Sequence, residues 1–373
     1  MKIDSIITAS ESYESWLGHS IPIVAADLRL KHKHMAESPF MFLRATFYRW
    51  MQNWNVACAE LSLAPKVLAV GDLHIENFGT WRDPDGRLIW GVNDFDEAFP
   101  TSYAIDIVRL ASSAWIAAKT GAFAVANDDA LNAILNGYER GIKKGGSPFV
   151  LEEHHLWLRD LALSELREPS RFWQKLEQLP KAKSSALANA RKELFKALPK
   201  TDSQPQLLAR VAGLGSLGRP RFIALVENGG SYVCREAKTI VPSACLWAQG
   251  TSAKKASGKS YIEEILHKAH RVRDPFYGVS GKWLVRRLAP HCSKIDVSHL
   301  PKKRDDLALF ESMGTEIANI HLGTRSAQSE IKRDLTAKRR KQIYACVERM
   351  TTLTLADWNE WRANWHPSGN TGP

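Results

Sequence analysis

Residues 71–98 read GDLHIENFGTWRDPDGRLIWGVNDFDEA, and this stretch decides how the rest of the chain is interpreted. Asp83-Pro84-Asp85-Gly86 is a strong turn signal at its centre. The apolar run KVLAV at 66–70 leads into the first acidic segment, and the strand-like RLIWGVN at 87–93 leads into the second. The pattern predicts a β-hairpin whose two ends both deliver acidic residues.

The acidic segments carry the spacing of a phosphoryl-transfer site. Asp72 and Asn77 form Asp-x-x-x-x-Asn, in which the Asp orients an attacking hydroxyl and the Asn amide oxygen binds Mg²⁺. Asp94, followed by Phe95, stands where a Mg²⁺-binding Asp-Phe-Gly would lie. Converging carboxylates repel one another unless a cation neutralises them. We therefore predict Asp72, Asn77 and Asp94 as catalytic residues and Asn77, Asp94 and Asp96 as metal ligands; a turn-rich acidic loop without function is the alternative.

Two neighbouring residues have less certain roles. His74 is a more usual general base by pKa, but only Asp72 stands five residues before Asn77, so we expect His74 to hydrogen-bond within the loop and hold its shape. Asp106 begins a helical pattern at 103–119. It either braces the catalytic loop from behind or is an ordinary first-turn acid favoured by the helix dipole.

A glycine-rich segment supplies the expected nucleotide-covering half. Residues 213–218 read GLGSLG and precede strand-like sequence, whereas a dinucleotide-binding turn would open a helix. Lys238 lies on the next strand candidate, as does the phosphate-contacting lysine of kinases. We expect Glu263, or else Glu264, in the predicted helix 258–272 to pair with it. The predicted nucleotide-binding residues are Gly213, Gly215, Gly218, Lys238 and Glu263.

The order of these parts is reversed relative to ordinary kinases, because the glycine loop follows the catalytic loop. A circular permutation accounts for this order, since only spatial assembly matters for the chemistry. We predict an α+β, bilobal, protein-kinase-like fold. Residues 1–145 carry the catalytic and metal loops, 146–205 form a helical connector, 206–290 form the small β-rich lobe, and helices in 291–373 complete the larger lobe.

These motifs resemble those of a bacterial family of unknown function with a circularly permuted protein-kinase-like core, distantly similar to aminoglycoside and choline kinases. The segments that carry the resemblance are MAESPF (35–40), FLR (42–44), GDLHIENFG (71–79), NDFDEA (93–98), DIVRLASS (106–113), GLGSLGRPRF (213–222), REAK (235–238) and LVRRL (284–288). The sequence departs from the family pattern at Ala45, where a glycine is expected, and at Arg219-Pro220. The resemblance implies phosphotransfer but no particular acceptor.

Composition limits the other function classes. The 373 residues carry a net charge of +11, but the basic runs are short and scattered, which favours solvated surface over a nucleic-acid groove. The histidine pairs lack a partner cluster for zinc, and no G-x-S-x-G elbow indicates a hydrolase. Neither a signal peptide nor an apolar run long enough to span a membrane is evident, so we expect a cytoplasmic protein.

The sequence thus predicts an ATP- and Mg²⁺-dependent phosphotransferase that acts on a hydroxyl of a small molecule or protein. AMP transfer on the same fold uses the same metal site with ATP turned around. A non-catalytic nucleotide-binding regulator and a basic nucleic-acid-binding module are the remaining alternatives. The acceptor and the oligomeric state do not follow from the sequence.

Overall fold

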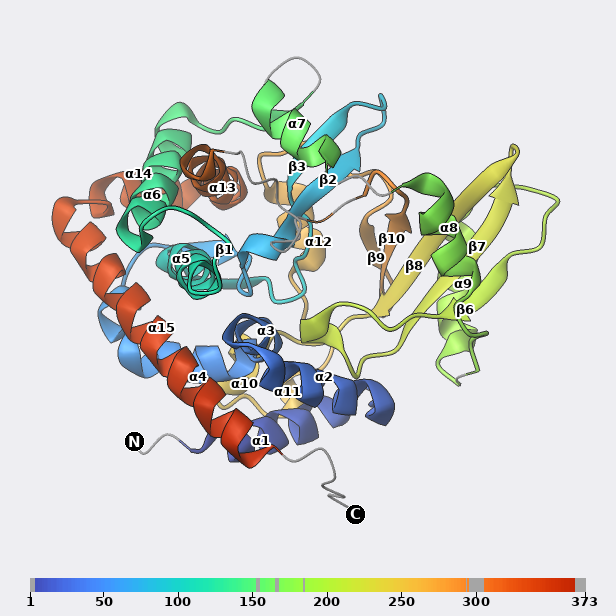
Figure 1. Cartoon of the computed structure of the whole chain (residues 1–373), viewed down its shortest axis with the longest axis horizontal. Helices are drawn as coiled ribbons and strands as arrows, with labels where there is room; N and C mark the ends of the chain where they lie inside the picture. Colours follow the sequence, from blue (N-terminus) through green and yellow to red (C-terminus); the bar gives the residue numbers. More distant parts are fainter. Residues whose placement is uncertain are drawn as a thin grey trace.

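The structure is a computed structural model that describes residues 4–151, 155–164, 168–183, 185–292, 294 and 305–365. It is a mixed α+β chain with several small sheets and a larger helical part (Figure 1). None of the helices in these ranges is long and apolar enough to cross a membrane.

The predicted hairpin exists, but its first strand differs from the prediction. Strands β2 (Phe78–Arg82) and β3 (Leu88–Val92) pair antiparallel across the turn, and β5 (Phe149–Val150) adds to β3. The run at 66–70 instead forms β1 (Lys66–Ala69), which pairs with β4 (Phe99–Ser102). The turn fixes this outcome, because Arg82 opposite Leu88 sets the register that pairs Phe78 with Val92.

Helices from both ends of the chain build the larger part. The N-terminal ones are α1 (Ile6–Gly18), α2 (Ala25–Glu37), α3 (Pro39–Ala45) and α4 (Phe47–Ala57). Apart from α2, they pack around one apolar core with α5 (Ala104–Ala118), α6 (Asn127–Lys144), α13 (Asp306–His321), α14 (Gln328–Asp334) and α15 (Ala337–Asn364). Helix α2 joins α1, α3 and α15 in a second apolar cluster. Arg49 on α4 makes a buried ion pair with Asp357 on α15 at 2.8 Å. Residues far apart in the chain are therefore joined in one body.

The sequence explains the closest of these contacts. Helices α6 and α13 approach at Gly137, where a Cβ atom would lie 1.9 Å from the Glu311 carbonyl oxygen. Glycine is required there for the two backbones to meet. Ser38 caps α3 by accepting a hydrogen bond from the Met41 amide, with Pro39 at the first helical position.

A five-stranded antiparallel sheet forms the second part, at the right of Figure 1. Its order is β6 (Gln206–Ala209), β7 (Arg221–Asn228), β8 (Ser231–Thr239), β10 (Trp283–Leu288) and β9 (Gly278–Ser280). The hairpin β7–β8 turns at Gly229 and Gly230. Short helices α10 (Ala244–Ala248), α11 (Ala253–Ala256) and α12 (Ile262–Lys268) follow β8.

The segment predicted as a connector contributes to the core of this sheet. It contains α7 (Leu156–Ser164), α8 (Pro169–Glu177) and α9 (Leu187–Ala197). Helix α8 packs Phe172 and Leu176 on one face of the sheet, and α9 packs Ala190 and Leu194 on the other. The connector interpretation was therefore wrong for α8 and α9, because both apolar faces of a sheet need a covering layer.

The face that α8 covers changes character along the strands. Side chains two residues apart on a strand point to the same face. Next to the apolar residues under α8, which include Leu208, Ile223, Cys234 and Leu288, the same face continues with Arg210, Arg221, Glu236, Lys238 and Arg286. The sheet therefore presents a charged surface toward the helical part.

Candidate active site

The predicted catalytic loop, residues 71–77, is held from behind by Asp106. Both Asp106 carboxylate oxygens accept backbone hydrogen bonds, from the Val70 amide at 2.7 Å and from the Gly71 amide at 2.9 Å. His321 at the end of α13 lies 3.0 Å from the same carboxylate. Asp106 is fully buried, so it is a brace of this loop rather than an ordinary exposed first-turn acid.

Asp72 is fixed by an arginine that the sequence analysis did not identify. Arg109 donates from Nη2 to Asp72 Oδ1 at 2.6 Å and to the Leu43 carbonyl at 2.6 Å. Its guanidinium is fully buried and contacts the rings of Phe47 and Trp50. Burial raises the pKa of Asp72, and Arg109 partly offsets the rise. The sequence did contain a signal for Arg109, because this residue lies one helical turn after Asp106 on the same face of the predicted helix.

His74 has a different environment from the one expected. Its Nδ1 is buried without a hydrogen-bond partner among the described residues, and its ring packs edge-on against Phe40. Burial, reinforced by Arg44 and Arg109, holds the pKa of His74 well below its usual range. The expected side-chain hydrogen bond within the loop is therefore not formed through Nδ1, and the imidazole is neutral.

The base of the β2–β3 hairpin brings the predicted metal ligands together. The Asn93 amide donates to the Asn77 carbonyl at 2.9 Å, so Asn77 and Asp94 leave the hairpin side by side. The side-chain nitrogen of Asn77, Nδ2, donates to the Asp72 backbone carbonyl at 2.7 Å. Asp94 contacts Lys294 at 3.3 Å and Lys238 at 3.6 Å. Burial alone would raise the pKa of Asp94, but these ammonium groups hold it well below its usual range.

Asp96 lies at the same place but is already paired. It contacts Lys238 at 2.5 Å and Arg219 at 3.4 Å, while its Oδ1 is buried without a partner among the described residues. The described residues contain no cluster of three or more His, Cys, Asp or Glu side chains suited to a metal ion. An amide oxygen and one or two carboxylates nevertheless fit Mg²⁺, which usually takes its other ligands from water and phosphate oxygens.

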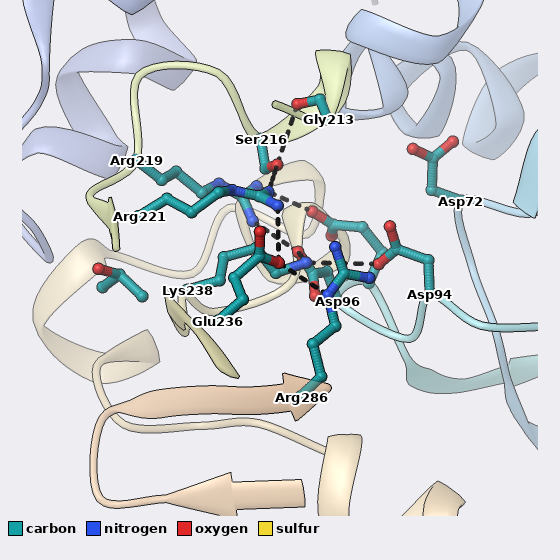
Figure 2. A network of polar contacts seen from close by, with 12 residues as sticks. Asp72, Asp94, Asp96, Gly213, Ser216, Arg219, Arg221, Glu236, Lys238 and Arg286 are labelled. Atoms are coloured by element: carbon teal, nitrogen blue, oxygen red, sulfur yellow. Dashed lines mark hydrogen bonds and ion pairs between the residues drawn. The ribbon is translucent and has the colours of Figure 1, made fainter. Parts of the chain in front are cut away.

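The lysine of the sheet does not form the predicted ion pair. Lys238 is 3% exposed, and its ammonium contacts Asp96 and Asp94 (Figure 2). Glu263 is exposed on α12, and Glu264 pairs with Lys268 at 2.6 Å. The prediction of Glu263 or Glu264 as the partner of Lys238 was therefore wrong. The hairpin-base carboxylates take that position because the sheet folds directly onto them.

The glycine loop, residues 213–218, lies close to the catalytic loop. A Cβ atom at Gly215 would be 2.9 Å from the Arg44 carbonyl oxygen and 3.7 Å from Asp72 Oδ2. Gly213 and Gly218 have φ values of 76° and 91°, which favour glycine. Gly213, Gly215, Asp72, Asn77 and Asp94 all line one small cavity of about 70 Å³, which we call the catalytic cavity.

The N-terminal helices add side chains that no motif had indicated. Tyr13, Lys31 and Tyr48 also line the catalytic cavity, and Lys31 lies over the Tyr48 ring at 5.3 Å. Burial lowers the pKa of Lys31 to about 8 and raises the pKa of Glu97, another lining residue, to about 7. The wall facing Asp72 is thus both aromatic and ionisable.

A larger cavity of about 320 Å³ adjoins the first and shares Arg44, Asp94, Gly213, Leu214 and Lys294 with it. We call it the arginine cavity. Its lining also includes a set of further arginines: Arg210, Arg221, Arg271, Arg273, Arg286 and Arg287. Apart from Asp94, the only acidic residue among its described lining is Asp274. The cavity is therefore suited to an anionic ligand.

Comparison with known proteins links the chain to a bacterial group. Residues 24–208 match the sequence profile of a family described as "Uncharacterized protein conserved in bacteria (DUF2252)". The match covers just under half of the chain; it includes Asp72, Asn77, Asp94 and Asp106 and ends before the glycine loop. No curated protein and no solved structure matches the chain. The family description names no activity.

Proposed function

We propose that the protein is an ATP- and Mg²⁺-dependent phosphotransferase with a kinase-like fold in circularly permuted order. The observation that carries the proposal is the convergence of Asp72, Asn77, Asp94 and the glycine loop on one pair of adjoining cavities, with the Lys238 ammonium paired to Asp94. These groups lie far apart in the sequence, and each belongs to a type that phosphoryl transfer requires. A turn-rich acidic loop without function gives no reason for this convergence.

The strand positions support the same proposal. The glycine loop connects the first two strands of the five-stranded sheet, β6 and β7, and Lys238 lies on the third, β8. Kinases carry their glycine-rich loop and strand lysine in the same arrangement. The turn that follows α13 is hydrogen-bonded to β1 through Thr324 Oγ1, which accepts from the Leu68 amide at 3.0 Å. This contact brings a late helix close to the strand that precedes residues 71–77, which supports a permuted order.

Each residue has a role that follows from its contacts. Asp72 orients the acceptor hydroxyl and accepts its proton as the hydroxyl oxygen bonds to the γ-phosphorus and ADP leaves. Arg109 is a positioning residue, because it fixes the Asp72 carboxylate from a buried site. Asn77 and Asp94 would hold Mg²⁺, which when bound neutralises phosphate charge. Lys238 holds Asp94 and Asp96 in place beside it.

AMP transfer is a second candidate, and the arginine cavity favours it. In the kinase-like orientation the base of ATP would enter this cavity, yet six arginines besides Arg44 line it. ATP turned around would instead place its phosphate tail there and its α-phosphate beside Asp94. Both reactions use the same metal-binding residues.

Labelled ATP tests the proposal and separates the two candidates. Purified protein is incubated with Mg²⁺, with γ- or α-labelled ATP, and with metabolite or protein pools as acceptors. Transfer of γ label supports the phosphotransferase, and transfer of α label supports AMP transfer. Asp94→Asn is expected to abolish either transfer, with Asp85→Asn on the exposed hairpin turn as the control. Transfer that persists in Asp94→Asn, or that needs no divalent cation, contradicts the proposed site.

A further inference from the structure

Three arginines of the sheet share a single buried carboxylate. Glu236 is fully buried and contacts Arg221 at 3.0 Å, Arg286 at 2.7 Å, and Arg210 (Figure 2 shows Arg221 and Arg286 meeting it). We call Arg210, Arg221 and Arg286 the arginine trio. They come from three different strand regions, so the sheet face described above places them together. Burial alone would raise the pKa of Glu236, but the trio holds it well below its usual range.

The trio has two positive charges more than its own carboxylate can neutralise. The next carboxylates, Asp94 and Asp96, are paired with Lys238 and Lys294. Ser216 Oγ, which accepts from Arg221 at 2.6 Å, is neutral. Buried like charges without counter-ions are costly. A protein that only needed to brace Glu236 would do so with one arginine.

The surplus charge faces open space. Arg210 and Arg286 have 17% and 18% of their side chains exposed, whereas Arg221 has 3%. All three line the arginine cavity, directly beside Gly213 of the glycine loop. Lys238, the residue expected to hold phosphates, is buried against Asp96 and does not line this cavity. The trio therefore has the accessible positive charge that Lys238 lacks.

We propose that the arginine trio binds the polyphosphate chain of the nucleotide and takes the role that a strand lysine has in kinases. Guanidinium groups match phosphate oxygens in fork geometry and keep their charge when buried. An anion of two or more negative charges neutralises the surplus. ATP and ADP, whose longer phosphate chains carry more negative charge than the single phosphate of AMP, should therefore bind more tightly than AMP, and uncharged adenosine should bind least. This inference rests on the proposed nucleotide site and deepens it. It places the phosphate chain of ATP in the arginine cavity, which is the orientation that the AMP-transfer candidate uses.

Direct binding of inorganic tripolyphosphate to the full chain tests the trio without relying on catalysis. Isothermal titration is expected to show one site, with tripolyphosphate displaced by ATP and only weakly by AMP. Arg286→Gln should weaken tripolyphosphate and ATP binding by about ten- to a hundredfold, since it removes one charged hydrogen-bonding group. Arg273→Gln is the matched control, because Arg273 lines the same cavity but is exposed and donates to the His267 carbonyl.

Stability separates a binding role from a structural one. If the trio serves a ligand, Arg286→Gln relieves repulsion, and the ligand-free variant should melt at the same temperature as the wild type or higher. If the trio only braces Glu236, the variant should melt lower and bind tripolyphosphate normally, and that result overturns the inference. An equal loss of binding in Arg273→Gln also overturns it, because any positive charge in the cavity would then serve.

The same experiment distinguishes this inference from the proposed function. Tripolyphosphate binding that is lost in Arg286→Gln, in a protein that transfers no label from ATP, supports the trio and contradicts the phosphotransferase. Label transfer by a protein whose ATP affinity is unchanged by Arg286→Gln supports the phosphotransferase and overturns the trio.

Discussion

Replacing Arg109 with Met tests whether the ion pair that fixes Asp72 is as important as its burial indicates. Arg109 is fully buried, and it donates to Asp72 Oδ1 from Nε at 3.1 Å and from Nη2 at 2.6 Å. Methionine retains much of the length and can keep the contacts with the rings of Phe47 and Trp50. The substitution therefore removes mainly the charge and its hydrogen bonds.

The expected loss follows from the burial of the pair. Removing one partner of a buried ion pair costs about 3–5 kcal/mol, because an uncompensated charge remains. Asp72 has 18% of its side chain exposed, so we expect a loss near 3 kcal/mol in the free energy of unfolding. The matched control is Arg140→Met, which breaks an ion pair with Glu311 in which both side chains are well exposed, and it should cost less than about 1 kcal/mol.

The loss should depend on pH in a defined direction. In Arg109→Met the Asp72 carboxyl stays buried and loses its cation, so its folded-state pKa rises further above the unfolded value. A carboxyl with a raised folded-state pKa favours the fold at low pH and disfavours it as pH rises through that pKa. Urea unfolding of wild type and variant should therefore show a larger difference at about pH 8 than at about pH 5. A difference that does not change with pH, or that persists in an Asp72→Asn background, would refute this reasoning.

Three further predictions concern neighbouring residues. Asp72→Ala should lower kcat by about a hundredfold or more with ATP affinity retained. His74→Gln should lower kcat much less, because the buried imidazole is neutral. An inactive His74→Gln beside an active Asp72→Ala would show that His74, not Asp72, is the base. Gly215→Ala should weaken ATP binding, since its Cβ would lie 2.9 Å from the Arg44 carbonyl oxygen. Gly278→Ala is the control, because its Cβ would meet open space and the variant should bind ATP as the wild type does. Equal ATP affinities of the two variants would contradict the placement of the glycine loop. Burial raises the pKa of Glu97 to about 7, so stability should fall as pH rises from about 4.5 to about 7, and Glu97→Gln should remove that part of the slope in a melting series.

Much of the site was predictable because short spacings fix local geometry. The turn at Asp83–Gly86 places Asn77 and Asp94 together at the hairpin base, and the sequence contains both the turn and the two residues. Asp106 could be identified as a candidate brace for the same reason, since its helix begins shortly after the hairpin. Only the fold could show that the partners of Asp106 include two backbone amides.

The errors concern contacts between distant segments. Glu263 seemed the natural partner of Lys238 because a helix follows the strand, but the sheet packs Lys238 onto Asp94 and Asp96 instead. The surplus of arginines around Glu236 arises from three strand regions, so no local pattern reveals it. The run at 66–70 is more apolar than Phe78–Arg82, yet register from the turn, not hydrophobicity, selects the strand that pairs with β3.

Whether Asp94 holds Mg²⁺ beside a bound nucleotide can be tested directly. The measurement is the binding of a non-hydrolysable ATP analogue to wild type and to Asp94→Asn, with and without Mg²⁺. We expect Mg²⁺ to strengthen binding to the wild type by about tenfold or more, and Asp94→Asn to abolish this gain. Without Mg²⁺, the variant should bind the analogue at least as tightly as the wild type, because one negative charge has left a cationic site. Equal Mg²⁺ enhancement in both proteins, or no binding by either, would contradict the account.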